Sequence, residues 1–203
     1  MKIAIIGAGN VGRALGEGWT RAGHAVVYGV RDAAKAAAAL PGAALAAPAE
    51  AARGADVVVL TVPFAALEAT VGSLGDLAGK VVLDATNPVG AGIRTSLAPG
   101  DSGAKRVAAA APGARVVKAF NTTGFNVMAN PRFGGEAAGM FVAGDDAAAK
   151  QVACSLAADL GFEPVDAGPL AQAELLEQLA MLWISMAIAH GHGREMAFRL
   201  VKR

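Results

Sequence analysis

The amino terminus joins a short apolar strand directly to a glycine-rich turn and a helix, and this junction constrains the fold more than any other feature. The apolar run from Ile3 to Ile6 leads into Gly7-Ala8-Gly9-Asn10-Val11-Gly12, after which a helical pattern begins. Gly7 permits a tight turn, Gly9 leaves the backbone open to a close approach, and Gly12 lets the helix pack against the strand. Because the first amides of the helix are free, the junction predicts a binding site for the pyrophosphate of a dinucleotide.

Short apolar segments alternate with alanine-rich helical stretches through most of the chain. The apolar segments lack the polar alternation of half-exposed strands, so they are expected to be buried on both faces of a sheet. This alternation predicts an α/β fold, a Rossmann-type parallel sheet with helices on both faces. After Gly168-Pro169 the pattern changes to one long helix. We therefore expect a single domain over residues 1–203, with a Rossmann-type core at 1–168 and a C-terminal helical appendage at 169–203.

Composition excludes several classes of protein. The 203 residues include 18 basic and 17 acidic side chains, and this formal net charge of +1 argues against a nucleic-acid partner. A lone cysteine, Cys154, allows no internal disulfide, and no Cys/His spacing predicts a metal site. The apolar stretch Leu179–Ala189 falls short of the roughly 20 residues that cross a bilayer. We expect a cytoplasmic protein with no membrane partner.

The residues after the second strand indicate which dinucleotide fits. An acidic side chain at this position accepts hydrogen bonds from the ribose of NAD, whereas an arginine suits the 2′-phosphate of NADP. The strand from Ala25 to Tyr28 ends at Gly29, with Arg31 and Lys35 following, while Asp32 is placed to cap the next helix. The planar guanidinium matches a phosphate group. These residues predict NADP(H) over NAD(H); the alternative is a solvated basic pair at a helix start.

Ligands of open α/β sheets bind beyond the carboxyl ends of the strands, so the residues that follow each strand are candidates for the site. They are Thr61-Val62-Pro63-Phe64, Asp84-Ala85-Thr86-Asn87-Pro88 and Ala119-Phe120-Asn121-Thr122-Thr123. Small, apolar and amide-bearing side chains suit a nicotinamide and a second flat ring. Asp84 could act as a base, or bond the amides of its own turn. We assign no catalytic residue, because hydride transfer between two bound cofactors depends on proximity and orientation.

Several segments taken together resemble a known family. They are Ile6-Gly7-Ala8-Gly9-Asn10-Val11-Gly12, Gly29-Val30-Arg31-Asp32 with Lys35, Thr61-Val62-Pro63, Asp84-Ala85-Thr86-Asn87-Pro88, Val117-Lys118-Ala119-Phe120-Asn121-Thr122 and Asp166-Ala167-Gly168-Pro169-Leu170. Over nearly its whole length the chain resembles the NADPH-dependent coenzyme F420 reductases, and more distantly the NADPH-binding domains of six-transmembrane metalloreductases. The segment Phe120-Asn121-Thr122 stands where the F420 reductases carry Leu-His-Thr, and looks like the metalloreductase domains.

The resemblance implies a function and a set of binding residues. It implies hydride transfer between NADPH and coenzyme F420, or a flavin-like acceptor, by a homodimer. By position, it implies that the pyrophosphate is held by Gly9, Asn10 and Val11, the 2′-phosphate by Val30, Arg31 and Lys35, and the nicotinamide by Thr61, Val62, Pro63 and Ala119. The second ring would stack beside Pro63, Asn87 and Asn121. Where the family has a serine or threonine this chain has Val30, so phosphate binding would depend more on Arg31.

Two alternative functions stay open. An NADPH-dependent reductase of a small carbonyl or imine substrate would need a proton donor near the nicotinamide, and Lys118 is the nearby candidate. A dinucleotide-binding module without turnover would pass its redox state to a partner.

The long C-terminal helix, expected over 170–199, carries a wide apolar face. Along that face lie Leu175, Leu179, Leu182, Trp183, Met186 and His190. We expect this helix to form the two-fold interface of a homodimer.

Overall fold

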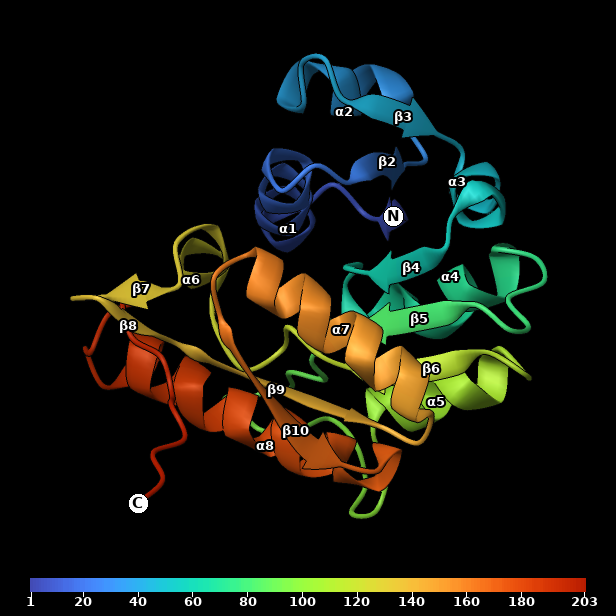
Figure 1. Cartoon of the computed structure of the whole chain (residues 1–203). Coiled ribbons are helices and arrows are strands. Elements are labelled where there is room, and N and C mark those ends of the chain that lie inside the picture. Colours follow the sequence, from blue (N-terminus) through green and yellow to red (C-terminus); the bar gives the residue numbers. More distant parts are fainter.

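An eight-stranded sheet forms the centre of the molecule (Figure 1). The computed structural model covers residues 1–203. The strands of this sheet are β1 (Lys2–Ile6), β2 (Ala25–Gly29), β3 (Ala44–Ala46), β4 (Val57–Leu60), β5 (Val81–Asp84), β6 (Arg115–Lys118), β9 (Gly139–Gly144) and β10 (Glu163–Gly168). Their order across the sheet is β10-β9-β6-β5-β4-β1-β2-β3. Two further strands, β7 (Arg132–Phe133) and β8 (Glu136–Ala137), pair with each other in a separate hairpin.

Helices cover both faces of this sheet, which confirms the predicted α/β fold. They are α1 (Asn10–Arg21), α2 (Ala33–Ala39), α3 (Pro48–Gly54), α4 (Leu67–Ser73), α5 (Gly103–Ala110), α6 (Phe125–Ala129), α7 (Ala147–Asp159) and α8 (Ala173–Ile184). Successive residues of a strand point to opposite faces. In β1, Ile3 and Ile5 accordingly join the core cluster beneath α1 and α7, whereas Ala4 and Ile6 join the cluster beneath α3, α4 and α5.

The sheet is mostly parallel, as predicted, but one of its strand pairings is antiparallel. β9 pairs with β6 in the antiparallel sense, and β10 then pairs with β9 in the parallel sense. A parallel connection needs a crossover, usually a helix that packs on one face of the sheet. Between β6 and β9 the helix is the short α6, which packs against α1. The chain therefore re-enters the sheet from the edge at which β6 ended.

The C-terminal helix is shorter than predicted. A helical turn at Leu170–Gln172 leads into α8, and a π-helical turn at Ser185–Ala189 ends the helical segment. Gly191 and Gly193 both have φ of +74°, in the left-handed region that stops a helix. Residues 190–203 are not helical, and the carbonyl of Phe198 accepts a hydrogen bond of 2.9 Å from the Gly139 amide. None of the helices has the length and apolar character to cross a membrane.

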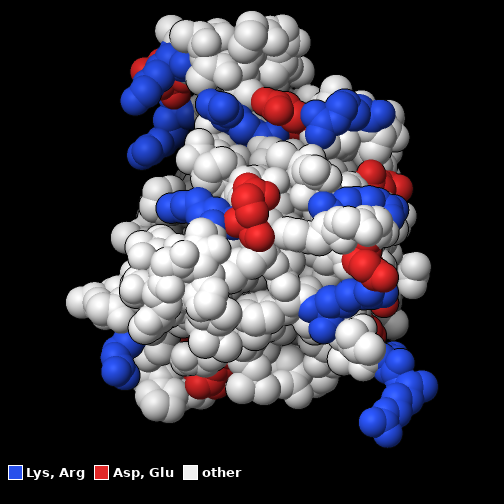
Figure 2. All heavy atoms as spheres, turned by 90° about the vertical axis from the view of Figure 1, so that its left-hand side faces the viewer, with Lys and Arg blue, Asp and Glu red and all other residues white.

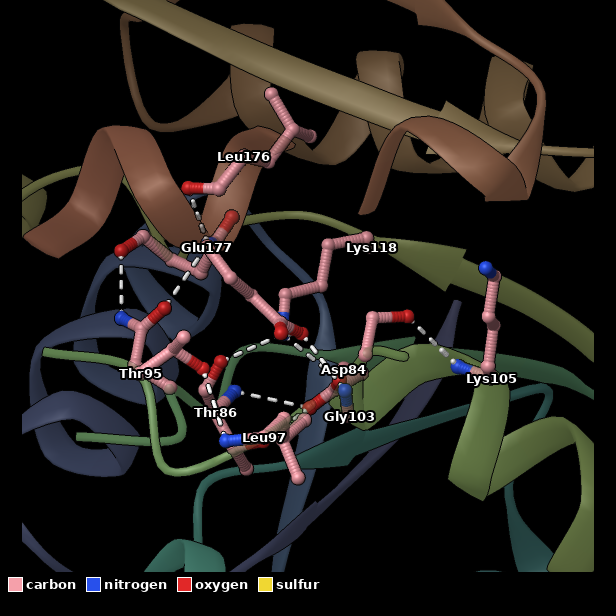
Figure 3. Close-up of polar contacts among 12 residues, drawn as sticks. Asp84, Thr86, Thr95, Leu97, Gly103, Lys105, Lys118, Leu176 and Glu177 are labelled. Carbon is pink, nitrogen blue, oxygen red and sulfur yellow. Dashed lines mark hydrogen bonds and ion pairs between the residues drawn. The ribbon is translucent and has the colours of Figure 1, made fainter. Parts of the chain in front are cut away.

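A buried cluster of three charged groups fastens α8 to the sheet (Figure 3). The Nζ atom of Lys118, at the end of β6, lies 2.9 Å from Asp84 Oδ2 and 2.8 Å from Glu177 Oε1. It also donates a hydrogen bond of 2.6 Å to the carbonyl of Thr86. Asp84 and Lys118 are 0% exposed and Glu177, on α8, is 2% exposed. Three secondary-structure elements thus meet at a single ammonium group.

The two carboxylates of the cluster have different additional partners. Oδ1 of Asp84 accepts hydrogen bonds from the amide and the hydroxyl of Thr86, at 2.9 and 2.7 Å. Oε1 of Glu177 accepts one from the Gly103 amide, 2.9 Å away, where α5 begins. Burial raises the pKa of the Glu177 carboxyl, an effect that the neighbouring Lys118 opposes. Desolvation therefore outweighs the favourable charge interaction for this second carboxylate.

We predict that Lys118→Met destabilises the protein strongly. The substitution leaves two buried carboxylates without a cation, a change that typically costs about 3–5 kcal/mol of unfolding free energy. Urea denaturation followed by circular dichroism measures this difference. A loss of less than about 1 kcal/mol would contradict the central role of the ammonium.

The matched variant Glu177→Gln should behave differently. The raised pKa of Glu177 means that its neutral form is favoured by folding, so its contribution to stability is present at low pH and is lost as the pH rises through the folded-state pKa. A neutral glutamine does not suffer this loss. The wild-type protein and Glu177→Gln should have similar unfolding free energies near pH 4, and Glu177→Gln should be the more stable of the two at higher pH.

Candidate functional site

The candidate residues gather along one edge of the sheet, where five parallel strands end. β1, β2, β4, β5 and β6 are parallel and end at this edge, toward which the arrows of β4 and β5 point on the left of Figure 1. Figure 2 shows the molecule from that side, with charged side chains at the top, on the right and just above the centre, and a broad uncharged area below the central ones toward the left. The predicted segments follow these strand ends directly: 7–12, 30–35, 61–64, 85–88 and 119–123.

The glycine loop has the geometry that close approach requires. Gly7 has a φ of +115°, and its amide donates a hydrogen bond of 3.1 Å to the Gly29 carbonyl, joining the loop to the end of β2. A Cβ atom on Gly12 would lie 2.4 Å from the carbonyl oxygen of Gly7. At Gly9, by contrast, a Cβ would meet nothing within 4 Å. The helix therefore packs tightly on the strand, while the loop stays open toward the outside.

The helix that follows this loop offers unpaired amides at its start. Gly9 is the N-cap of α1, and no side chain caps the helix. The first amides, including those of Asn10 and Val11, cannot bond within the helix. Uncapped amides combined with the open space at Gly9 form a cradle that fits a pyrophosphate group.

Thr61 supports the loop from the neighbouring strand. Its hydroxyl donates to the carbonyl oxygens of Ile6 and Gly7, at 3.1 and 3.2 Å. The side chain that the sequence places beside the nicotinamide thus also holds the glycine loop against the end of β4. Val62 is half-buried and Pro63 is exposed at the same edge.

The end of β2 has no room for an acidic side chain. A Cβ on Gly29 would lie 2.7 Å from Ile6 Cδ1 and 3.1 Å from Pro48 Cα. Asp32 accepts a hydrogen bond of 2.9 Å from the Lys35 amide, which confirms its predicted role as the cap of α2. Arg31 and Lys35 are exposed and form no ion pair, and Val30 is half-buried. Two cationic side chains are therefore free to meet an anion here.

Two asparagines interlock at the ends of β5 and β6. Asn87 Nδ2 donates to the backbone carbonyl of Asn121 at 2.8 Å, and Asn121 Nδ2 donates to Asn87 Oδ1 at 3.0 Å and to the Leu176 carbonyl at 3.1 Å. These acceptors fix the orientation of the Asn121 amide. Its Oδ1 atom has no partner, although Asn121 is only 2% exposed. The amide oxygen of Asn121 is therefore a buried hydrogen-bond acceptor without a partner.

A strained residue sets the direction of the chain after β6. Phe120 has a φ of +61°, in the left-handed region, and its ring packs edge-on against Trp19 at 5.4 Å. Ala119 is fully buried in the core, so its side chain is not exposed to a ligand. The whole residue, backbone included, is covered by its neighbours.

The charged cluster at this edge was not predicted. Asp84 accepts a hydrogen bond from the amide of Thr86 in the turn that follows it, which is one of its two predicted roles. Lys118 then joins Asp84 to Glu177, which is far away in the sequence. A signal for Glu177 existed: it lies at helical spacing from Ala173, Ala180 and Met181, which form the buried face of α8. A lone acidic residue on an apolar helix face indicates a buried cation opposite.

Comparison with known proteins gives the chain a family. The family model described as NADP oxidoreductase coenzyme F420-dependent matches residues 2–88. The F420-dependent NADP reductase of Methanothermobacter marburgensis is 33% identical over 212 residues, covering 93% of both proteins. A crystal structure from Arthrobacter sp. FB24, assigned to the F420-dependent NADP reductases, has a TM-score of 0.88 and 33% identity and covers 100% of both chains.

A second relative is a larger protein, of which this chain matches one part. The metalloreductase STEAP3 of Rattus norvegicus is 31% identical over 182 residues, which cover 89% of this chain and 36% of that protein. The chain thus corresponds to about a third of the metalloreductase and to nearly the full length of the Methanothermobacter reductase. The similarity over 93% of both chains shows that this protein is an NADPH-dependent oxidoreductase of the F420-dependent NADP reductase family.

Proposed function

We propose that the protein transfers hydride between NADPH and coenzyme F420. The observation that carries the proposal is the uncapped, open glycine cradle at the start of α1, in a chain that matches F420-dependent NADP reductases over nearly its whole length. When bound, NADPH would supply the hydride. The protein contributes binding, orientation and electrostatics.

The residues divide into three binding regions along the edge of the sheet. Amides at Gly9, Asn10 and Val11 would hold the pyrophosphate, with Gly7 and Gly12 shaping the loop. The basic side chains of Arg31 and Lys35, with the backbone at Val30, would hold the 2′-phosphate. The exposed Pro63 and its neighbours Thr61 and Val62 would face the nicotinamide, and the pair Asn87–Asn121 would orient the rings from the other side.

The charged cluster argues against the reduction of a small carbonyl or imine substrate. That reaction needs a proton donor, and Lys118 is the candidate. An ammonium group carries three hydrogens, and three oxygens lie within 2.9 Å of Lys118 Nζ. With these partners and 0% exposure, Lys118 has no hydrogen left for a substrate. Transfer between two bound rings requires no such donor.

The rate of NADPH oxidation with F420 tests the proposal, with FMN and FAD as parallel acceptors. We expect turnover with F420 that exceeds the rate with either flavin by at least about tenfold, a preference that roughly 1.4 kcal/mol of differential transition-state binding provides. Tight binding of NADPH without any F420 turnover would refute the assignment of the acceptor.

Arg31→Ala should weaken NADPH binding selectively. Loss of a hydrogen bond to a charged group costs about 1.5–3 kcal/mol, so the Kd for NADPH should rise by about 10- to 100-fold, with little change for NADH. Fluorescence titration measures both constants. Arg53→Ala, which removes an exposed arginine from α3, is the matched control. An equal effect of Arg31→Ala on both nucleotides would contradict the NADP assignment.

The outer face of α8 supports the proposal of a homodimer. Leu175, Leu182 and Ile188 are 62%, 51% and 56% exposed. The half-buried Leu179 and Met186 extend the stripe, in which Leu175, Leu179, Leu182 and Met186 follow one another at spacings of three or four residues. Such a stripe of apolar side chains is typical of a surface that meets another helix. The face predicted to be apolar is therefore the outer one except for Trp183, which is 4% exposed and belongs to the face that α8 buries.

Light scattering at micromolar concentration should give the mass of a dimer. Leu182→Glu places a charge in the centre of the stripe and should yield a monomer, because desolvating an unpaired carboxylate is strongly unfavourable. Ala38→Glu, on the exposed side of α2, should leave the dimer intact. A monomeric wild-type protein would contradict the prediction of a homodimer.

A further inference from the structure

The buried cluster carries more negative charge than its lysine needs. One carboxylate, that of Asp84, is enough to neutralise Lys118, and their atoms are 2.9 Å apart. Glu177 adds a second carboxylate, so the three groups carry a net charge of −1 when all are ionised. No other cationic side chain forms an ion pair with either carboxylate. The Gly103 amide at the start of α5 is the remaining polar contact of Glu177.

The cluster lies next to the residues proposed to surround the nicotinamide. Lys118 directly precedes Ala119, and it bonds the carbonyl of Thr86, the neighbour of Asn87. A Cβ on Gly103 would lie 3.0 Å from Phe64 Cε2 and 3.2 Å from both Asp84 Oδ2 and Glu177 Oε1. Phe64 follows Pro63 in the chain. One layer of side chains therefore separates the excess charge from the segment at the end of β4.

A charge at this place distinguishes the two redox forms of the nucleotide. The nicotinamide ring of NADP⁺ carries one positive charge that the ring of NADPH lacks, and their phosphates and adenine are identical. Charges in a protein interior are screened far less than charges in water. A buried net negative charge therefore stabilises the bound oxidised ring and leaves the reduced ring nearly unaffected.

We infer that Glu177 tunes the relative affinity of the site for NADP⁺ and NADPH through the excess negative charge that it gives the Asp84–Lys118–Glu177 cluster. This inference rests on the proposed function, because it takes the nicotinamide to lie at the ends of β4, β5 and β6. Glu177 makes NADP⁺ bind more tightly relative to NADPH, and so makes bound NADPH the stronger hydride donor. It touches neither ring and acts through the field of the cluster.

The arrangement around Glu177 favours this role over simple fastening of α8. A neutral glutamine could accept the same hydrogen bond from the Gly103 amide and fill the same space between α8 and β6. The charge, which burial disfavours, adds nothing to the packing. What the charge does provide is an electrostatic potential at the edge of the sheet.

The test compares dissociation constants for NADP⁺ and NADPH, measured by isothermal titration calorimetry at about pH 8 without any acceptor. Glu177→Gln should raise the ratio of Kd for NADP⁺ to Kd for NADPH roughly tenfold, the effect of one unit charge on the order of 10 Å away at an effective dielectric constant of about 20. Glu177→Asp keeps the charge, so its ratio should stay close to that of the wild type. Glu174→Gln is the matched control. It removes a half-buried carboxylate one turn earlier on α8, which accepts a hydrogen bond from the Gly100 amide.

Each outcome has a distinct meaning. A raised ratio in Glu177→Gln alone supports the inference. An unchanged ratio, or an equal weakening of both nucleotides, overturns it and leaves Glu177 a structural role. If the wild-type protein binds neither nucleotide, the proposed function itself fails. If the wild-type protein binds both nucleotides but the ratio of the two Kd values does not change in Glu177→Gln, only the inference about Glu177 fails.

Discussion

The ammonium group of Lys118 is the interaction on which the carboxyl edge of the sheet depends. It lies between carboxylates from β5 and α8 and bonds the turn that carries Asn87. Charge buried in this way is tolerated only when it is paired and hydrogen-bonded. The pairing brings the C-terminal helix to the same edge as the glycine loop. One buried cation thus holds α8, near the C-terminus, at the sheet edge where the N-terminal glycine loop lies.

The opposite end of the site is set by contacts too close for any side chain. Gly12 lies almost against the carbonyl of Gly7, and Gly29 is enclosed by β1 and α3. The first contact lets α1 direct its free amides outward, and the second removes the position from which an acidic residue would recognise an unmodified ribose. Arg31 and Lys35 are then the charged groups available beside the loop. Preference for a phosphorylated nucleotide follows from packing as much as from charge.

Much of this arrangement was predictable because it depends on local chemistry. The glycine spacing, the strand and helix periods and the cap at Asp32 involve neighbours in the chain, and the fold class and the carboxyl-edge segments follow from them. The reversal of β9 was not predictable in the same way. It depends on where α6 packs, which is decided by a contact with α1 more than 100 residues earlier in the chain. The C-terminal helix ends earlier than its apolar pattern predicts, because Gly191 and Gly193 adopt the left-handed conformation that stops a helix.

The sequence by itself determined the dinucleotide-binding junction, the alternating α/β order and the set of segments that meet at one sheet edge. Each of these features depends on residue types that lie only a few positions apart in the chain. Tertiary structure alone decided the partner of Lys118. Asp84 is 34 residues before it and Glu177 is 59 residues after it, and no local pattern reveals that the three side chains share one buried volume. It also decided which face of α8 is buried. Long-range packing and desolvation, not local propensity, govern both outcomes.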